Sequence, residues 1–569
     1  MESSKGSDDA LNALNASAPK QSKYEKMLQR SKYPSRWRLL IAFISVFVSS
    51  AIMLAYFVLD VCDIVPGPLT FKEPHSSTVV SSPRALLSVL SSTEGAVYGK
   101  KINRGKAQKI IDDLIADPSI SNSTSVVIMD AKGSVIASHE VNTPREPAST
   151  LKTLTAAVAS RTLDMGSTLD TQVFLLPKST KEPEYASKFN ARKIVLRGNG
   201  DMLLGVGEND WHHVNGRAGL ATLAKKTALA LKIDNIHKVS LEVDDSLFGS
   251  KRAPSLIYET DVERRFYART SSLAVDDARQ RDLALQGVDA DAMTDFPLSD
   301  PQPALSAGNI FAKLLIKQGV EVENFSNKNS DENSKKSENS TEDSSQNNKN
   351  SDDENASKES QNKESQNNES QNTAIKVSET KSLITPNSQL LAKVSSAPLN
   401  EVMAYMLRIS DNTLAEEFGR LTALATNKRN SPEGAVQAVK EGLRKLKVDT
   451  RGLRMSDCSG LSPKSQLRVS TLAKVQVLNV EANSGGAAAA EGLSLPGLVG
   501  TSRKRLADAS SAGLLRVKTG SLDQVSSMVG NVSRKDGGVL TFAVVANKPA
   551  DFWGAFVAIN KFMAQLPNL

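Results

Sequence analysis

An uninterrupted apolar run near the start of the chain constrains its architecture more than any other feature. Residues 39–59, LLIAFISVFVSSAIMLAYFVL, carry no charge, and 21 such residues are long enough to cross a bilayer as a helix. Seven lysines and arginines precede the run in 20–38, and basic flanks stay on the cytoplasmic side. We therefore expect a basic cytoplasmic tail in 1–38, one transmembrane anchor in 39–59, and everything after Asp60 outside the cell.

A cleaved signal peptide is the main alternative to an anchor. Its apolar region is usually shorter and is followed by an A-x-A-like site, which the sequence DVCDIVPGP (60–68) does not contain. We exclude a lipoprotein anchor at Cys62, because Asp60 stands where small residues are required. An uncleaved anchor is favoured, with secretion after cleavage as the alternative, and in both cases the rest of the chain is exported.

The composition argues against several kinds of partner. The formal charge of +7 is spread along the chain and no basic stripe alternates with aromatics, so we expect no nucleic-acid binding. Cys62 and Cys458 provide neither a metal-ligand spacing nor a disulfide framework, and we expect no metal and no cofactor. The five histidines are scattered, and His212 and His213 lie in a polar loop sequence, so a histidine base is unfavourable.

Two segments have compositions that do not build a core. Residues 60–95 are rich in Pro, Ser and Thr and are expected to form a linker. Residues 326–372 are polar, with Ala356 as the one apolar side chain, so burial cannot offset the entropy lost on ordering them. We expect this tract to be a disordered surface insertion without a catalytic role.

Elsewhere the hydrophobic pattern predicts regular structure. A helix in 101–117 is followed by two apolar strands around the D-A-K-G turn at 130–133, then by a loop and a helix from about Thr150. Near the C-terminus, 525–532 and 539–547 are antiparallel strand candidates. The closing helix is expected to bury one face, formed by Trp553, Phe556, Ile559, Met563 and Leu566.

Among these elements, one Ser-x-x-Lys sequence stands at a helix start. Four such sequences occur, and only Ser149 with Lys152 lies where a hairpin and a loop lead into a helix. The other three begin at Ser17, Ser360 and Ser378, in the tail, in the polar tract or beside it. The position along the chain therefore singles out Ser149.

Two further motifs follow in order. Ser410-Asp411-Asn412 lies between two predicted helices, and Lys-Thr-Gly occurs once, at 518–520, on a predicted edge strand 516–521. Ser-x-x-Lys, Ser-x-Asn and Lys-Thr-Gly in this order are typical of β-lactamases and penicillin-binding proteins. Each motif is common by itself, but the ordered set is rarely produced by chance.

These residue types suit acyl transfer by a serine nucleophile. Ser149 must lose a proton to attack an acyl carbon, and Lys152 lies on the same helical face within reach of the hydroxyl. A lysine acts as a base only when neutral, so its pKa must be lowered by burial and by a nearby positive charge, which Lys518 could supply. The helix N-terminus and the backbone N–H groups of Ser149 and Ser521 would stabilise the oxyanion.

The remaining motif residues suit proton transfer and substrate binding. We expect Ser410 to relay a proton to the leaving amine and Asn412 to hydrogen-bond the substrate amide. Lys518 and Thr519 suit a terminal carboxylate, and Gly520 lets the substrate lie close to the edge strand.

Five further segments carry a resemblance to a known family: EPASTLKTLTAA (146–157), GNGDMLL (198–204), DDSLFGSKRAPS (244–255), DCSGLS (457–462) and SLPGLVGT (494–501). With the three motifs, the chain resembles serine D-alanyl-D-alanine carboxypeptidases/endopeptidases of the class C, low-molecular-mass penicillin-binding protein type (peptidase family S13). The similarity covers roughly 95–320 and 375–569. Met202 replaces an expected proline, and Cys458 replaces a glycine.

The spacing of the motifs predicts an insertion. Ser149 and Ser410 are 261 residues apart, and 214 remain when the 47-residue polar tract is left out. In β-lactamases the gap is far shorter, because both motifs belong to one compact domain. We predict an α/β fold in which a transpeptidase-like (β-lactamase-like) domain, an antiparallel sheet flanked by helices, is built from 96–162 and 396–569. A large, mostly β region in 163–395 would be inserted between the first two motifs.

The resemblance implies a D-alanyl-D-alanine carboxypeptidase that removes the terminal D-Ala from peptidoglycan stem peptides through a Ser149 acyl-enzyme. It also implies that β-lactam antibiotics acylate the same serine. Two alternatives remain: a D,D-endopeptidase that cuts peptidoglycan cross-links with the same residues, and a non-catalytic cell-wall-binding scaffold tethered by the anchor.

Overall fold

The structure, a computed structural model, describes residues 35–61, 99–178, 191–281, 289–291, 296–323, 325, 375–506, 511 and 513–569. The expected tail up to residue 34, the expected linker from residue 62 to 95 and the polar tract 326–372 lie outside the described residues. The chain divides into two units, Met1–Ser81 and Ser82–Leu569.

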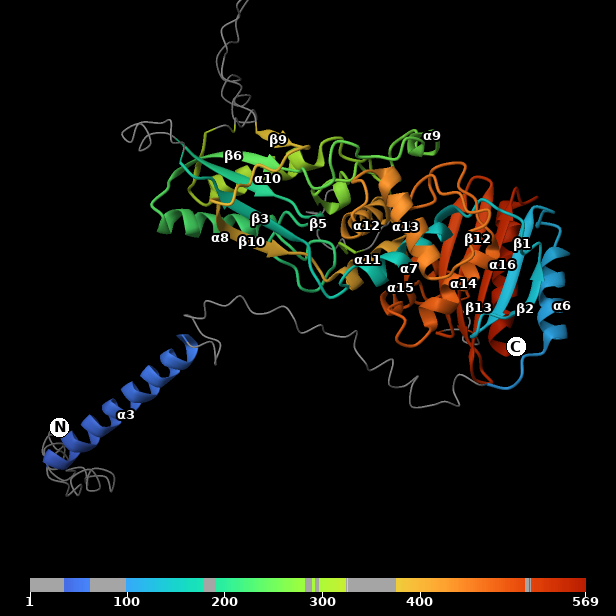
Figure 1. Ribbon diagram of the computed structural model, residues 1–569, viewed down its shortest axis with the longest axis horizontal. Helices are drawn as coiled ribbons and strands as arrows, with labels where there is room; N and C mark the ends of the chain where they lie inside the picture. Colours follow the sequence, from blue (N-terminus) through green and yellow to red (C-terminus); the bar gives the residue numbers. More distant parts are fainter. Residues whose placement is uncertain are drawn as a thin grey trace, which may run out of the picture. The chain divides into compact units, whose positions relative to one another are not determined.

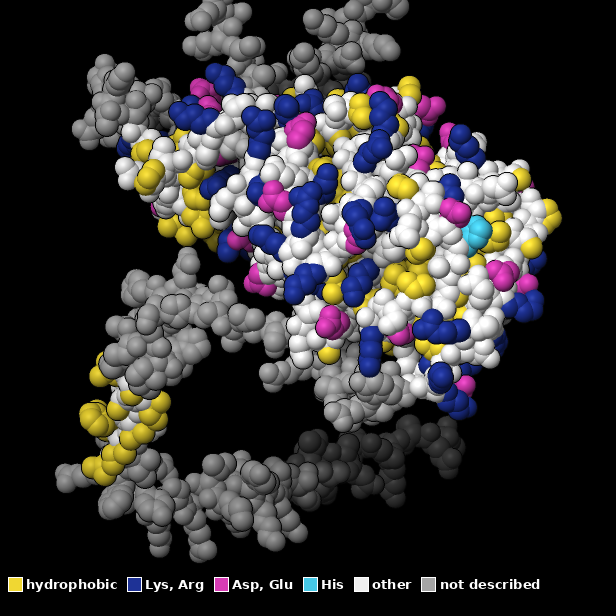
Figure 2. Space-filling model, turned by 45° about the vertical axis from the view of Figure 1, so that its right-hand side comes forward, with side chains coloured by type: hydrophobic (Ala, Val, Ile, Leu, Met, Phe, Trp, Pro, Cys, Tyr) yellow, Lys and Arg dark blue, Asp and Glu magenta, His cyan; other side chains and the backbone are white. Residues whose placement is uncertain are grey.

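The first unit has one described element, the 27-residue helix α3 (Ser35–Val61). Its side chains are described at 40 and 43–56, and Figure 2 shows this stretch as a column of hydrophobic side chains. Large apolar residues in it, such as Phe43 and Phe47, are exposed. Within the described residues, no helix combines the length and the apolar character needed to cross a membrane.

The second unit contains a five-stranded antiparallel sheet in the order β11-β12-β13-β1-β2 (Figure 1). β1 and β2 form the predicted hairpin, with Gly133 at φ 82° in its turn. Strands from both ends of this unit thus pair in one sheet, and the predicted antiparallel sheet with an edge strand at Lys-Thr-Gly is confirmed. The strands are β1 (Thr124–Asp130), β2 (Val135–His139), β11 (Leu515–Leu522), β12 (Val525–Ser533) and β13 (Val539–Asn547).

Helices cover both faces of this sheet, as predicted. Phe542 and Val544 of β13 face one side, and Ala543 and Val545 face the other, which explains why the strand is apolar throughout. The first face packs against α6 (Arg104–Ile115) and α16 (Phe552–Gln565). The second packs against α7 (Lys152–Thr162), α13 (Pro432–Lys445) and α14 (Val469–Val480).

The closing helix α16 buries a different face from the one predicted. Trp553 is 71% exposed and Phe556 is only partly buried, so the prediction is wrong for these two residues. The sheet-facing positions near its start are occupied by Ala555 and Ala558, because small side chains let the helix approach the strands closely. Farther along the helix the prediction is confirmed, with Ile559, Met563 and Leu566 buried.

Two helices meet at the predicted break near Ser410. α11 (Leu399–Ile409) ends there because Ser410 has left-handed backbone angles, φ 64° and ψ 37°. α12 (Asn412–Ala425) follows, and the Asp411 carboxylate caps it by accepting the N–H of Leu414. The shorter elements of this part are α15 (Ala487–Glu491), η1 (Ala148–Leu151), η4 (Gly500–Ser502) and η5 (Leu566–Asn568).

The inserted region builds a second sheet, of mixed type, in the order β10-β3-β4-β6-β8, with β9 also paired to β6. The 14-residue helix α8 (Leu220–Ile233) and the 15-residue helix α10 (Pro303–Lys317) pack on it (Figure 1). The region is therefore mixed α/β, and the prediction of a mostly β region is wrong: the apolar face of the sheet needs a covering layer, which these helices provide. Its strands are β3 (Asp170–Leu175), β4 (Arg192–Arg197), β6 (Lys238–Asp244), β8 (Glu321–Val322), β9 (Lys376–Ser378) and β10 (Gln389–Ser395).

A smaller part of the inserted region pairs two short strands in parallel. These are β5 (Asp201–Leu204) and β7 (Leu273–Val275), and the short turn η3 (Asp276–Ala278) follows β7 directly. One short helix, α9 (Ile257–Thr260), lies between these two strands in the chain. Met202 of β5, at the position where a proline was expected, is buried in the core shared with α11 and α12.

Candidate active site

The candidate nucleophile lies on a tight turn at the start of a buried helix. Ser149 belongs to the 3-10 turn η1, which runs directly into α7, so the predicted position in the first helical turn holds. Ala148, just before it, has φ 50°, a left-handed value that is uncommon for a residue with a Cβ atom. Thr150 and Leu151 are buried while Ser149 stays partly exposed, so the turn leaves the serine accessible.

Lys152 points back at this serine from the first turn of α7. Its Nζ lies 2.9 Å from Ser149 Oγ, 2.6 Å from Asn412 Oδ1 and 3.0 Å from the carbonyl oxygen of Ser459. A neutral amine has two N–H donors and one lone pair. The amide and carbonyl oxygens fit the two donors, which directs the lone pair to the hydroxyl of Ser149.

Burial tunes both lysines of the site. It lowers the pKa of Lys152 from 10.5 to about 8, and the carboxylates of Asp457, Asp411 and Glu416 act in the opposite direction. The pKa of Lys518 is lowered well below its usual value, by burial first and by the charge of Lys152 second. Protonating both buried amines at once is unfavourable, because each positive charge is poorly solvated and the two charges repel. The pair therefore favours a state with at least one neutral lysine.

The second and third motifs meet at a hydrogen bond. Lys518 Nζ lies 2.8 Å from Ser410 Oγ and 2.8 Å from the carbonyl oxygen of Thr519. The Thr519 hydroxyl lies 2.8 Å from that of Thr501 on η4, and both threonine hydroxyls are at the exposed end of this group. The arrangement places a buried amine and two hydroxyls together as hydrogen-bond donors, which suits a carboxylate.

Two glycines let separate segments approach the nucleophile turn. A Cβ atom at Gly520 would lie 2.9 Å from the carbonyl oxygen of Pro147 and 3.0 Å from the amide nitrogen of Thr150. A Cβ atom at Gly460, which has φ 84°, would overlap the carbonyl group of Ala148. Gly520 was predicted to make room for the substrate, and in the structure it also makes room for the turn that carries the serine.

The contacts gather seven of the eight predicted site residues. Ser521 lies next to Gly520 on β11 and is exposed, and its place in an oxyanion hole stays a prediction. The side-chain amide of Asn412 already makes two hydrogen bonds: its Nδ2 donates to the carbonyl oxygen of Phe266 at 2.8 Å, and its Oδ1 accepts from Lys152 Nζ. One N–H of this amide remains for the substrate. The seven are Ser149, Lys152 and Asn412 in one set, Ser410, Lys518 and Thr519 in a second, and Gly520 against the turn.

Sequence reasoning missed Asp457. Its carboxylate accepts the backbone N–H groups of Ser459 at 3.0 Å, Gly460 at 2.6 Å and Ser462 at 2.6 Å. These bonds fix the loop that presents the Ser459 carbonyl to Lys152. An aspartate followed by serine and glycine is a typical sequence for such a turn, so the DCSGLS segment held a usable signal beyond its family resemblance.

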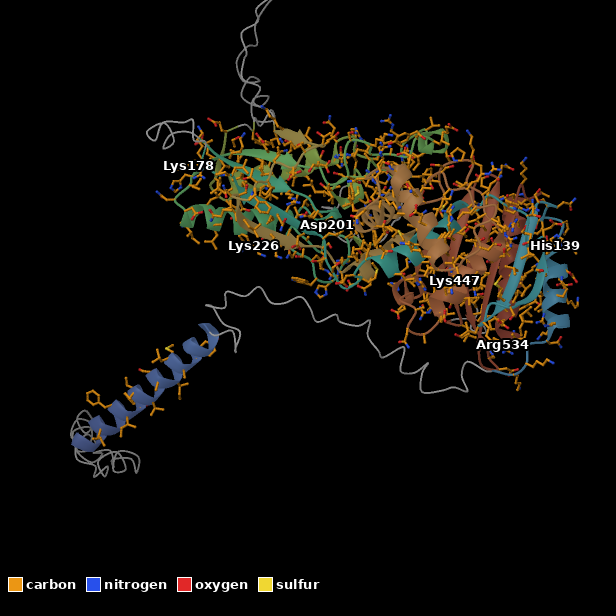
Figure 3. The ribbon with its side chains drawn as sticks, in the orientation of Figure 1. His139, Lys178, Asp201, Lys226, Lys447 and Arg534 are labelled. Carbon is orange, nitrogen blue, oxygen red and sulfur yellow. The ribbon has the colours of Figure 1, made fainter. Side chains whose placement is uncertain are left out.

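Cys458 and the histidines play no part in these contacts. The Cys458 side chain is fully buried, and burial raises the pKa of its thiol well above the usual value, as expected of an unreactive cysteine. His139 lies on β2, at the sheet edge opposite β11 (Figure 3), and His213 bonds Asp210 at 2.7 Å in the predicted loop. Over the described part of the chain, no group of three or more His, Cys, Asp or Glu side chains could hold a metal ion.

A serine at a helix start, a buried lysine beside it and a Lys-Thr-Gly edge strand define a serine acyl-transfer enzyme of the penicillin-recognising class. The chain belongs to the D-Ala-D-Ala carboxypeptidase 3 (S13) family, whose profile matches residues 107–566. It is therefore a serine-type hydrolase of the D-Ala-D-Ala carboxypeptidase class, as the sequence predicted.

Individual relatives agree with this assignment. A carboxypeptidase of Mycobacterium tuberculosis is 27% identical over 442 residues, which cover 76% of this chain and 78% of the relative. A carboxypeptidase of Mycolicibacterium smegmatis is 28% identical over 446 residues, with the same coverage. The crystal structure of penicillin-binding protein 4 from Haemophilus influenzae has the same fold, with a TM-score of 0.56 at 18% identity over 82% of this chain and 98% of that one.

Proposed function

We propose that this protein removes the terminal D-Ala from peptidoglycan stem peptides through an acyl-enzyme on Ser149. The observation that carries this is the 2.9 Å contact between Ser149 Oγ and the buried Nζ of Lys152, whose pKa burial lowers to about 8. Ser149 Oγ attacks the carbonyl carbon of the penultimate D-Ala, and its proton passes to Lys152. The C–N bond breaks, D-Ala leaves, and water then hydrolyses the ester and regenerates Ser149.

The second set of residues serves the leaving group. Ser410, 2.8 Å from Lys518, would pass a proton to the departing amine, and Lys518 with Thr519 would bind its carboxylate. The remaining N–H of Asn412 would hold the substrate amide. The backbone N–H groups of Ser149 and Ser521 would bind the oxyanion.

β-Lactams would be inhibitors of the same serine. A β-lactam offers a strained amide with a carboxylate at the position of the terminal D-Ala carboxylate, so it fits the same nucleophile and the same Lys518–Thr519 pair. A homologue of this fold from Haemophilus influenzae has been crystallised with a β-lactam. This supports binding of β-lactams by the present site.

A groove beside the site supports a second activity, D,D-endopeptidase cleavage of peptidoglycan cross-links. The groove has a volume of about 670 Å³ and is lined in part by Tyr405, Arg408 and Thr501. Thr501 contacts Thr519, so the groove begins where the carboxylate of a leaving D-Ala would end. The second stem peptide of a cross-link is a longer leaving group and would occupy this groove.

The N-terminal helix is proposed to anchor the enzyme in the cell membrane, with its active site on the cell-wall side. The support comes from the sequence: residues 39–59 are uncharged and long enough to span a bilayer, and the sequence before them is basic. The described side chains of α3, at 40 and 43–56, cover only part of this run. Secretion after signal cleavage is the alternative. Mass spectrometry of the mature N-terminus, with fractionation of membranes, distinguishes the two.

A fluorescent penicillin tests the catalytic proposal. The full-length protein should form a covalent adduct that survives denaturation, and Ser149→Ala should form none. Ser160→Ala, at a buried serine of α7 whose hydroxyl donates to the carbonyl oxygen of Ala157, should label like the wild type. Absence of label on the wild type, or equal label on Ser149→Ala, would favour the scaffold alternative.

Defined muropeptides then separate the two activities by mass spectrometry. Loss of one D-Ala from monomers shows the carboxypeptidase, and conversion of cross-linked dimers to monomers shows the endopeptidase.

A further inference from the structure

Asp411, the middle residue of the Ser410-Asp411-Asn412 turn, has no role in the chemistry above, yet it is 2% exposed. Its carboxylate caps α12 through Leu414 N at 2.8 Å. The preceding Ser410 holds left-handed angles, which are unfavourable for a non-glycine residue and persist only when the surroundings enforce them. Something outside the turn must therefore hold it.

The inserted region supplies contacts to three successive residues of this turn. Arg279 Nη2 lies 2.8 Å from Asp411 Oδ2. The carbonyl oxygen of Phe266 accepts from Asn412 Nδ2 at 2.8 Å. The N–H of Ala268 donates to Thr413 Oγ1 at 3.0 Å. The segment 266–279 thus contacts residues 411, 412 and 413 directly.

Arg279 is itself held firmly. Its Nε lies 3.1 Å from Asp277 Oδ2 and its Nη1 lies 3.0 Å from the carbonyl oxygen of Arg265, so all three guanidinium nitrogens have a partner. The side chains of Arg279 and Asp411 are 4% and 0% exposed. An arginine fixed on three sides defines the position of the carboxylate that it binds.

The backbone that presents Arg279 is strained. Asp276, Asp277 and Ala278 have φ 53°, 55° and 54°, three successive non-glycine residues in the left-handed region. Strain of this kind in a buried segment survives only where neighbouring contacts compensate for it. Asn215 provides one such contact, with its Nδ2 2.6 Å from Asp276 Oδ1.

The electrostatics agree with this geometry. Burial alone would raise the pKa of Asp411, but the Arg279 guanidinium lowers it below the usual value, so the carboxylate stays ionised. Burial and the charge of Asp411 raise the pKa of Asp277 well above its usual value. The Arg279 guanidinium therefore pairs most strongly with the Asp411 carboxylate, which lies 2.8 Å away.

Resting on the proposed function, we propose that Arg279 is a positioning residue for catalysis. By holding Asp411, it keeps Ser410 Oγ within hydrogen-bonding distance of Lys518 Nζ, and Asn412 Oδ1 within hydrogen-bonding distance of Lys152 Nζ. The inserted region is then part of the active site: it fixes the turn that links the two lysines, although none of its described side chains touches the reacting atoms.

The test compares two buried arginines of the inserted region in the full-length protein. Arg279→Met should lower the rate of acylation by a fluorescent penicillin about 10–100-fold, because catalytic groups displaced by about 1 Å lose this much. It should lower kcat for D-Ala release and kcat/KM by similar factors, as expected when an interaction of the transition state is lost. Arg279→Lys keeps the charge and should recover part of the rate.

Arg252→Met is the matched control. Arg252 pairs with Asp245 at 3.0 Å, with side chains 3% and 5% exposed. It also donates to the carbonyl oxygen of Thr270 in the segment 266–279 but contacts none of the motif residues, so it separates support of that segment from the contact with Asp411. It should lower the melting temperature, but acylation measured well below that temperature should stay within about twofold of wild type.

Several results would overturn the proposal. One is an acylation rate in Arg279→Met equal to that of the wild type. Another is an equal loss of acylation rate in Arg279→Met and Arg252→Met when the two variants have equal melting temperatures. If Arg279→Met does not fold, Arg279→Lys is tested in its place. Acylation of Arg279→Lys at the wild-type rate would also overturn the proposal. Failure of the proposed function gives a different result, since the wild type would then form no adduct.

Discussion

Two sets of buried charges in this molecule differ in what surrounds them. In the inserted region, Arg252 faces the Asp245 carboxylate. In the active site, Lys152 and Lys518 are fully buried and, among the described residues, their hydrogen-bond partners are neutral oxygens. A buried ion pair joins two segments, whereas a buried amine that faces neutral oxygens releases its proton more readily. The first arrangement serves the fold and the second serves the chemistry.

The largest expected effect is on the chemistry of the lysine. Lys152→Met removes the base and should lower the rate of acylation by a fluorescent penicillin about 10²–10⁴-fold, the range typical of general-base catalysis. Lys226→Met is the matched control, because Lys226 is exposed on α8 in the inserted region (Figure 3) and should not affect the rate. A rate near wild type for Lys152→Met would show that another base acts.

For stability we expect the reverse ranking, with a larger loss in Arg252→Met than in Lys152→Met. Arg252→Met leaves the Asp245 carboxylate buried without its partner and should lower the free energy of unfolding by about 3–5 kcal/mol. Lys152→Met should cost less than half of that, because the amine it removes was itself costly to bury. Urea denaturation of both variants checks this, and equal losses would remove the distinction between the two kinds of buried charge.

The pH dependence should report the lysine directly. Because Lys152 must be neutral and its pKa is about 8, acylation at pH 6 should be about 100-fold slower than on the plateau above pH 8. Folding lowers this pKa from 10.5, so the unfolded chain binds more protons between pH 8 and 10.5, and this group makes the fold more stable as pH rises through that window. A flat rate profile from pH 6 to 9 would contradict the assignment.

The smallest effect is expected at Cys458. Its thiol packs against Gly419 and is fully buried, so in a Cys62→Ser background it should react with a thiol reagent only after denaturation. Cys458→Ala should cost about 1 kcal/mol of stability and leave acylation unchanged. Rapid labelling of the folded protein would show that the active-site loop opens.

Local pattern was enough to predict the catalytic half of the fold. The hairpin at 130–133, the strands β12 and β13, the break at Ser410 and the edge strand with Lys-Thr-Gly all follow from short sequence signals. The failure at Trp553 shows the limit of such signals. A hydrophobic pattern predicts that the largest apolar side chains are buried. Close packing of α16 on the sheet instead requires the small side chains of Ala555 and Ala558 at the buried positions.

The site was predictable where its chemistry is encoded in the side chains themselves. Ser149, Lys152 and Lys518 must be these residue types for the reaction to proceed. Asp457 holds its own loop through backbone N–H groups two to five residues away, a local signal that motif reasoning passed over. Arg279 instead acts on Asp411 in another segment, and that partner is set by a tertiary contact rather than by spacing. The carbonyl oxygens of Ser459 and Phe266 carry no residue-type signal at all, so no sequence pattern could have indicated them.

The ends of the described second unit meet at one side chain. Arg534, after β12 (Figure 3), donates to the carbonyl oxygens of Lys100 at 2.7 Å and Leu569 at 2.9 Å. At the other end of the same strand, Ser527 donates to the carbonyl of Pro147 beside the nucleophile, and the seven residue steps from Ser527 to Arg534 span about 23 Å of extended chain. One central strand therefore links the two ends of the described second unit to the turn that carries Ser149.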